Sequence, residues 1–147
     1  MPVQLRESVH KAHRLPRTES VLMGRAELLA PADRDLLEAV LIHGTPTTML
    51  ARMMRVNCAS LRRRIHRLTR RLVSKEFLDA ARAIPYLEPD DATLARQVFC
   101  EGTSQRELLS VMGVSMYHLR YRMMRLRAEI AVLARLRRTG QRQTKHA

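Results

Sequence analysis

Two stretches decide the fold: LRRRIHRLTRRL at residues 61–72 and LRYRMMRLRAEI at residues 119–130. In each of them apolar residues recur at the 3.6-residue period of an α-helix, and arginines occupy many of the positions between. One stretch follows the other at a distance of 58 residues (119 − 61 = 58). The pattern predicts two amphipathic helices of one design, used twice in the same chain.

The similarity extends well beyond these helices. When residues 29–68 are aligned with residues 87–126 without a gap, 15 of the 40 positions are identical. The identical pairs are Leu29/Leu87, Pro31/Pro89, Asp33/Asp91, Leu36/Leu94, Val40/Val98, Gly44/Gly102, Thr45/Thr103, Leu50/Leu108, Met54/Met112, Val56/Val114, Leu61/Leu119, Arg62/Arg120, Arg64/Arg122, Arg67/Arg125 and Leu68/Leu126. An excess of Leu and Arg raises chance matching, but it does not place Pro, Asp, Gly and Thr in register. A self-match at one fixed period indicates that a single supersecondary unit is present twice.

Each copy reads as three helices. Pro31 suits the first turn of a helix, Asp33 favours the positive end of the helix dipole, and Gly44 ends the helix. The second helix begins at Thr45-Pro46 in one copy and at the capping box Ser104–Glu107 in the other. A three-residue turn then leads to Asn57 or Ser115 as the N-cap of the third helix. The residues expected to face inward on the second and third helices are Leu50, Ala51, Met54, Leu61, Ile65, Leu68 and Leu72, and Leu108, Leu109, Met112, Leu119, Met123, Leu126 and Ile130.

The remaining segments also read as helical, and none shows the alternation of a strand. A helix is expected over residues 19–29, and Ser74 can cap another that Pro85 stops. The fold class predicted is therefore all-α, with two tandem helix-turn-helix modules joined by a helical linker. The expected segments are a basic N-terminal arm and lead helix (1–28), the first module (29–72), a linker helix (73–86), the second module (87–132) and a basic C-terminal tail (133–147).

The charge of the chain indicates a polyanionic partner. The net charge is +13, and 24 of the 27 basic residues are Arg, since only Lys11, Lys75 and Lys145 are Lys. A GC-rich genome explains Arg over Lys but does not explain the shortage of acids. Nucleic acid is the first candidate partner.

Several function classes are not expected. No apolar run approaches the length of a membrane span, and the polar N-terminus lacks the apolar core of a signal peptide. Cys58 and Cys100 occupy unlike positions in the two copies and give no disulfide framework, which favours the reducing cytoplasm. No metal-ligand cluster, catalytic pairing or phosphate loop is visible, so no metal, cofactor, small-molecule ligand or enzymatic activity is expected.

The repeated motif resembles the fourth, promoter-reading region of bacterial sigma factors. The resemblance rests on the LxPxD start, on the Gly-Thr junction and on an Arg, Arg64 or Arg122, three residues after the buried Leu. It covers residues 29–72 and 87–130, which is 88 of 147 residues (44 + 44). The chain departs from the family in three respects. The module is doubled, no promoter-melting region precedes it, and Arg55 stands where the family usually has Gly. A working sigma factor is therefore not expected.

The resemblance implies that the third helix of each copy enters the major groove of duplex DNA and reads bases with its N-terminal residues. The base-facing residues would be Ala59, Ser60 and Arg63 in the first copy and Tyr117, His118 and Tyr121 in the second. The residues expected to contact phosphate are Arg62, Arg64, Arg67, Arg70, Arg71, Arg120, Arg122 and Arg125. For the Tyr and His residues, a surface facing another protein is an equal alternative.

These features predict a nucleoid-associated, sequence-specific transcriptional regulator that binds double-stranded DNA through two modules as a pseudo-dimer. The alternative is a mimic of the fourth sigma region that binds RNA polymerase and recruits or blocks it. A nucleoid or RNA-binding role comes third. The two copies also differ in charge: residues 29–72 hold nine Arg and three acids, net +6, whereas residues 87–130 hold six Arg and six acids, net zero. The first module is therefore expected to hold DNA, and the second to add sequence choice or to face a protein.

Overall fold

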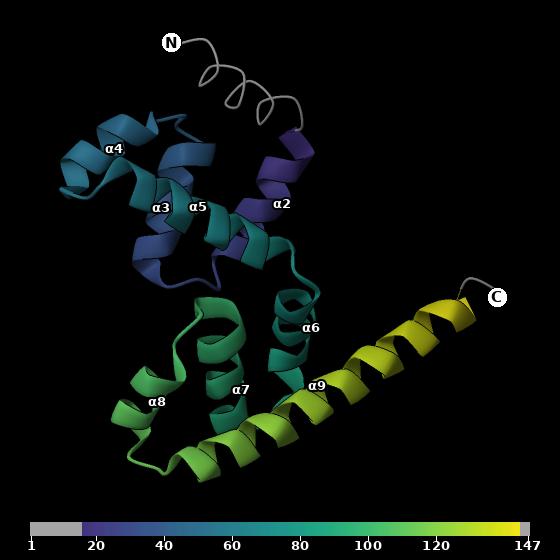
Figure 1. Ribbon diagram of the computed structural model, residues 1–147. Helices are drawn as coiled ribbons and strands as arrows, with labels where there is room; N and C mark the ends of the chain where they lie inside the picture. The colour runs from purple at the N-terminus through teal and green to yellow at the C-terminus, as the bar shows by residue number, and fades with distance from the viewer. Residues whose placement is uncertain (1–15, 145–147) are drawn as a thin grey trace. The chain divides into compact units, whose positions relative to one another are not determined.

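The computed structural model describes residues 16–144, and within that range every regular element is helical. The elements are α2 (Pro16–Ala26), α3 (Pro31–Leu41), α4 (Thr47–Met54), α5 (Cys58–Val73), α6 (Lys75–Ala83), η1 (Ile84–Tyr86), α7 (Pro89–Ala95), η2 (Arg96–Glu101), α8 (Gln105–Met112) and α9 (Met116–Thr144) (Figure 1). The predicted all-α class is confirmed. Most of the expected N-terminal arm lies outside the described residues. None of the described helices is both long and apolar enough to cross a membrane.

The chain divides into two compact units, Met1–Val73 and Ser74–Ala147. In the first unit α2 packs against α3 and α5, and Leu37 and Leu72 are completely buried at the centre. The helix expected over 19–29 begins and ends three residues earlier, at Pro16 and Ala26. Arg25 of α2 donates a hydrogen bond of 3.1 Å from Nη1 to the carbonyl oxygen of Leu72, which lacks a partner within α5. The first unit is thus a four-helix assembly closed by its lead helix.

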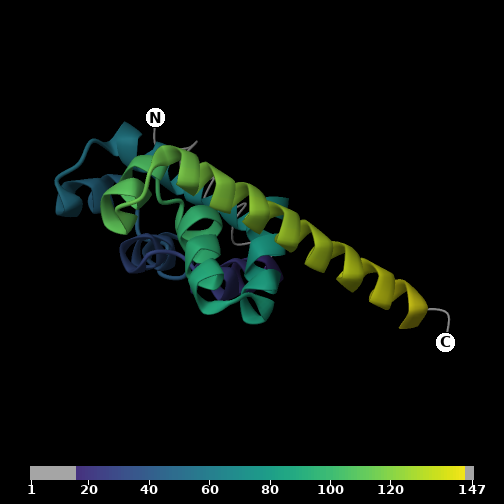
Figure 2. The same cartoon turned by 90° about the horizontal axis from the view of Figure 1, so that it is seen from below.

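The second unit has the same order of elements. Its first helix, α6, packs against η2 and α9 and buries Phe77, Ala80 and Ala83 (Figure 2). Ser74 caps this helix as expected, accepting a hydrogen bond of 3.2 Å from the Phe77 N–H. The segment expected as a linker over residues 73–86 is therefore, for most of its length, a packed part of the second unit. It occupies the place that α2 has in the first unit.

The Gly-Thr junction has the same geometry in both units. Gly44 and Gly102 adopt left-handed φ values of 59° and 71°. The next N–H donates across six residues, from Thr45 to the Ala39 oxygen at 2.9 Å and from Thr103 to the Gln97 oxygen at 2.8 Å. The predicted helix ends are confirmed. The helix before the junction differs, because α7 continues as the π-helical turn η2, whereas α3 is regular throughout.

Prolines and side-chain caps explain where several of the helices begin. Pro31 and Pro89 lie in the first turns of α3 and α7, and the capping box of α8 is complete. Its Ser104 Oγ accepts from the Glu107 N–H at 3.2 Å, while the Glu107 carboxylate accepts from the Ser104 N–H at 3.0 Å. These predictions are confirmed. Helices α3, α4 and α7 begin without a side-chain cap, at Ala30, Pro46 and Glu88.

Three expectations need correction. Met54 was expected to face inward, but it is 40% exposed because it ends the short helix α4. Ile65, Leu109 and Met112, likewise expected inside, are only half-buried. The basic tail expected from residue 133 is part of α9, which runs without interruption to Thr144. Arg has a high helix propensity, and neither Gly140 nor any proline ends the helix before that point.

The tight turns before the third helices provide a test of backbone strain. Arg55 and Gly113 occupy matching positions and both are left-handed, with φ values of 55° and 64°. A Cβ added to Gly113 would meet nothing within 4 Å, so a substitution there strains only the backbone. We expect Gly113→Ala to destabilise the second unit by about 1 kcal/mol and Arg55→Gly to stabilise the first by up to about 1 kcal/mol. Urea unfolding of both variants measures this, and equal midpoints for Gly113→Ala and the parent would contradict it.

Candidate nucleic-acid interface

The N-terminus of α5 is fixed by a side-chain cap. The Asn57 Oδ1 atom accepts hydrogen bonds from the N–H groups of Ala59, at 2.8 Å, and Ser60, at 3.3 Å. In the second unit the Ser115 Oγ atom accepts from the His118 N–H at 3.2 Å. Both predicted N-caps are confirmed, and the first turn of each third helix is thereby held in one orientation.

Helix α5 has one apolar and one basic face. Leu61, Leu68 and Leu72 are at most 3% exposed, whereas the opposite face carries exposed arginines. The exposed members are Arg62, Arg63, Arg67 and Arg70, and Arg71 is half-buried. Ala59 and Ser60 are exposed in the first turn, where the Ser60 hydroxyl accepts a 3.2 Å hydrogen bond from Arg63 Nη2. The candidate base-reading residues of the first unit therefore share one open surface with the candidate phosphate-binding arginines.

Arg64 is placed differently from its neighbours. Its Nε and Nη2 atoms donate to one carboxylate oxygen of Asp33, at 3.0 and 2.6 Å. Asp33 lies in the first turn of α3, and its side chain is only 16% exposed. The second unit repeats the pair between Arg122 and Asp91 at 3.5 Å. The structure thus places Arg64 and Arg122, two candidates for phosphate contact, against carboxylates that join the third helix to the first.

This pairing was missed by the sequence analysis, although a signal for it exists. Asp33/Asp91 and Arg64/Arg122 are among the identical positions of the two copies, and the separation within each copy is 31 residues. An acid and a base that repeat together at one separation are candidates for a structural ion pair.

The outward surface of the second unit's third helix is different in kind. Tyr117 is 82% exposed and Tyr121 is 48% exposed, and His118, Arg120 and Arg125 also face solvent. Position by position, Tyr121 replaces Arg63, and Met124 replaces His66. The candidates of the second unit therefore form an aromatic surface bordered by two arginines.

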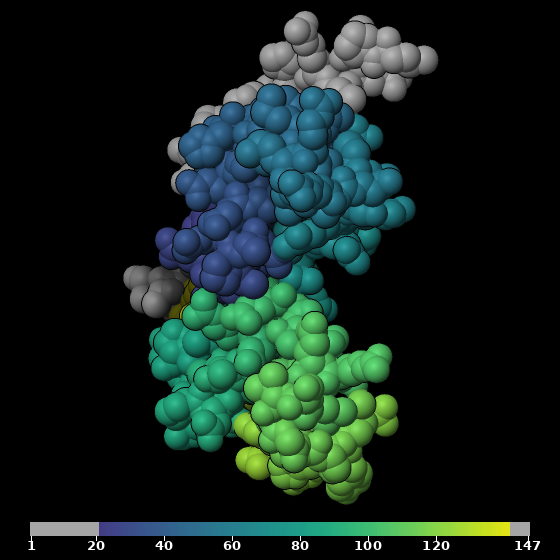
Figure 3. All heavy atoms as spheres, turned by 90° about the vertical axis from the view of Figure 1, so that its left-hand side faces the viewer, coloured from purple at the N-terminus to yellow at the C-terminus, as the bar shows by residue number. Residues whose placement is uncertain are grey.

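The short second helices α4 and α8 also present side chains to solvent. Figure 3 shows the side of the first unit on which α4 lies at the surface. Matching apolar residues, Met53 and Val111, are 72% and 78% exposed, and Met49 is 52% exposed. Met49, Met53 and Val111 lie on the helix that comes just before the third helix of each unit, and they carry no charge.

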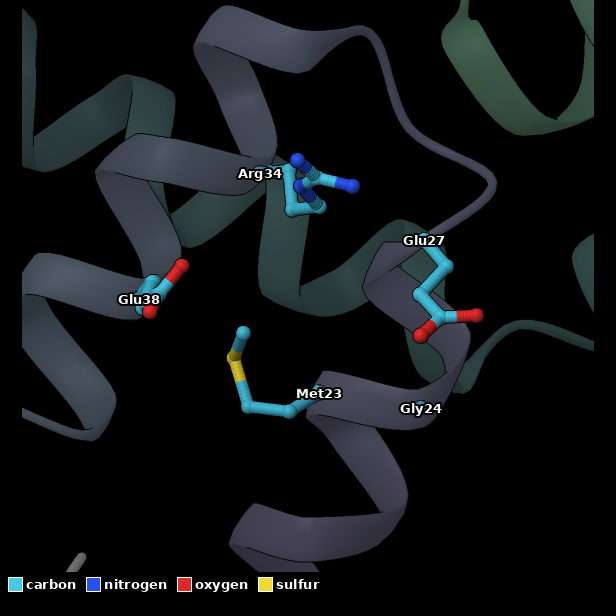
Figure 4. Close-up of a pocket in the computed structure, with 5 residues that line it drawn as sticks. All are labelled: Met23, Gly24, Glu27, Arg34 and Glu38. Carbon is cyan, nitrogen blue, oxygen red and sulfur yellow. The ribbon is translucent and has the colours of Figure 1, made fainter.

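A shallow hollow lies in the first unit. It lies between α2 and α3, has a volume of about 310 Å³, and is lined by Met23, Gly24 and Glu27 of α2 and by Arg34 and Glu38 of α3 (Figure 4). Its charged residues face open solvent, and none of them is buried. Among the described residues no group of three or more His, Cys, Asp or Glu could hold a metal ion.

Comparison of the chain with models of protein families, with curated proteins and with solved structures gives no match.

The two ion pairs should differ in strength. Asp33–Arg64 makes two short hydrogen bonds to a mostly buried carboxylate, whereas Asp91–Arg122 makes a single contact at 3.5 Å. We expect a coupling energy of about 1 kcal/mol or more for the first pair and about 0.5 kcal/mol or less for the second. Double-mutant cycles with alanine at each pair, followed by urea unfolding, measure both values. A second pair as strong as the first would contradict this assignment.

Proposed function

We propose that the chain is a transcriptional regulator that binds double-stranded DNA sequence-specifically through two tandem helix-turn-helix modules. Each module consists of a four-helix unit whose last three helices resemble the fourth region of sigma factors. The two would act as a pseudo-dimer on a site of two short boxes. The observation that carries the proposal is the surface of α5, where Arg62, Arg63, Arg67 and Arg70 are exposed over a buried leucine stripe. No cofactor or enzymatic step forms part of the proposal.

The geometry around the turn supports major-groove reading. Helix α4 ends at Met54 and α5 begins at Cys58, so a three-residue turn separates them, and α8 and α9 are separated in the same way. In such motifs the first turns of the second helix of the pair meet base edges. Ala59, Ser60 and Arg63 are exposed there, and Arg63 could donate to O6 and N7 of guanine.

The charge difference between the copies supports a division of roles. Residues 29–72 carry net +6 and residues 87–130 carry net zero, by the counts given above. Because non-specific affinity follows the number of phosphates neutralised, the first module would supply most of the binding free energy. The second module would add sequence choice through Tyr117, His118 and Tyr121, since the connection within one chain gives it a high effective concentration at the site.

One observation favours the alternative, a mimic of the fourth sigma region that binds RNA polymerase. Met49 and Met53 lie one turn apart on α4 and are 52% and 72% exposed, and methionine suits adaptable protein contacts. Selection of duplexes from a random pool by the full chain, in the absence of polymerase, separates the two functions. Recovery of a defined two-box sequence supports the DNA-binding proposal. If no sequence is enriched and the chain still binds polymerase, the result would support the polymerase-binding mimic instead.

The first DNA prediction separates base reading from phosphate contact. Arg63→Ala should weaken binding to the selected duplex by roughly 1–3 kcal/mol and change binding to random duplex little. Arg67→Ala combined with Arg70→Ala should weaken both duplexes alike and lower the slope of affinity against salt by about one per lost contact. Fluorescence anisotropy titrations at several salt concentrations measure these effects. An equal loss on random duplex would remove the base-reading role of Arg63.

The second DNA prediction uses arginines at identical positions in the two copies. Arg62 and Arg67 match Arg120 and Arg125, and all four are exposed. Replacing the first pair with Gln should weaken binding to random duplex by roughly tenfold or more at low salt, whereas replacing the second pair should have a much smaller effect. The two double variants remove the same charge from the same helical positions, so each controls for the other. A larger loss from Arg120 and Arg125 would reverse the assigned roles.

A further inference from the structure

Helix α9 carries a row of exposed apolar residues spaced four apart. Met124 is 62% exposed, Val132 is 54% exposed and Leu136 is 64% exposed, and exposed Ala128 lies between them. We call Met124, Ala128, Val132 and Leu136 the α9 row. The core of the unit takes another face of the helix, through Leu119, Met123 and Leu126. The row is therefore additional to the apolar stripe that folds the unit.

The α9 row has no counterpart in the first unit. The positions that match Met124 and Ala128 are His66 and Arg70, and α5 ends at Val73, before the position that matches Val132. In α9 the last buried residue is Ile130, yet the helix continues from residue 131 to residue 144. Figures 1 and 2 show this end of α9 standing clear of α6, α7 and α8. The row thus lies partly on a segment that neither the repeat nor the core of its unit requires.

The spacing of the row suits packing against another helix. Residues four apart form a ridge on a helix surface, and such ridges pack into the grooves of a partner helix. From Met124 to Leu136 the ridge is about 18 Å long, which gives several side-chain layers of contact. Beyond Ile130 the described residues of α9 are exposed or half-buried, and a helical segment with few buried side chains is only marginally stable in water. A partner helix along the row would therefore also stabilise the end of α9.

The charges beside the row define the partner. Residues 120–138 contain seven arginines and a single acid, Glu129. Six of them are Arg120, Arg125, Arg127, Arg135, Arg137 and Arg138, and the seventh, Arg122, is paired with Asp91 within the unit. A second copy of the chain would bring like charges together along the contact, which disfavours self-association. A helix whose apolar residues are flanked by Asp and Glu would be complementary in both shape and charge.

We propose that the α9 row is a docking surface for an amphipathic helix of an acidic protein partner. The partner would place apolar residues spaced three and four apart against Met124, Val132 and Leu136 and carboxylates against the bordering arginines. The distal end of the row is separate from the residues proposed to read bases, because Leu136 lies 19 residues along the helix from Tyr117 (136 − 117 = 19), about 28 Å. The proximal end is not, since Met124 lies one turn from Tyr121. The proposal does not depend on DNA binding.

The test uses the full chain and three synthetic helical peptides of equal length. The first has leucines along one face and glutamates on both sides of that face. The second has the same composition with the leucines spread around the helix, and the third has lysines in place of the glutamates. In fluorescence anisotropy at physiological salt, the first peptide should bind at least about tenfold more tightly than either of the others. Equal binding of the first two would show attraction by charge alone and would overturn the proposal.

Variants of the chain locate the contact. Val132→Asp and Leu136→Asp should each weaken binding of the first peptide by roughly tenfold. The matched control is Val111→Asp on α8, which changes an even more exposed apolar residue outside the row and should leave peptide binding unchanged. Circular dichroism checks that each variant is folded. An unchanged affinity of both row variants would overturn the proposal.

Two further measurements test whether the α9 row binds a second copy of the chain or nucleic acid instead of an acidic helix. Sedimentation equilibrium of the full chain should show a monomer, and a dimer that Leu136→Asp dissociates would assign the row to a second copy and overturn the proposal. Binding of random duplex DNA should be weakened much less than peptide binding by Val132→Asp. An equal loss of both would assign the row to nucleic acid instead.

Discussion

The burial of three leucines on α5 is the interaction on which the candidate interface depends. Six arginines between residues 62 and 71 repel one another with no acid among them, and each like-charge neighbour on a helix costs a few tenths of a kcal/mol. Leu61, Leu68 and Leu72 are almost completely buried, and each contributes roughly 1.5–3 kcal/mol. The apolar term is larger, so the helix stays docked with its charge exposed. Asp33 offsets one guanidinium, that of Arg64, and fixes the helix to α3.

Much of the fold could be predicted because it is encoded locally. The caps at Asn57, Ser104 and Ser115, the Gly-Thr junction and the left-handed turn each depend on residues within one or two turns of the site. Arg55 illustrates this best. The turn requires a left-handed residue, and the chain adopts that conformation at φ 55° although no glycine is present. The helical period likewise predicted the buried faces of α5 and α9, because it determines which side chains point the same way.

The features that were not predicted depend on contacts between distant residues. Arg64 and Asp33 are 31 residues apart, so the local sequence does not distinguish Arg64 from the solvent-exposed arginines beside it. Helix α6 was predicted as a linker because it lies between the two aligned copies, yet Phe77, Ala80 and Ala83 are buried in the second unit. The length of α9 was underestimated since its distal part lacks buried residues, which are the signal that periodicity detects. Exposed residues are the least constrained by the fold, and most of the candidate site residues are exposed.

The two units share a buried core but differ in the residues that their third helices expose. At matching outward positions α5 carries Arg63, His66 and Arg70, whereas α9 carries Tyr121, Met124 and Ala128. None of these side chains is buried or needed to hold its helix in place, so the fold does not explain the difference. Asp33 relieves part of the repulsion within α5, and an anion against the exposed arginines would relieve more. The exposed apolar row of α9 leaves water only when another apolar surface covers it. One scaffold therefore presents two outward surfaces of different chemistry, a basic one on the first unit and a partly apolar one on the second.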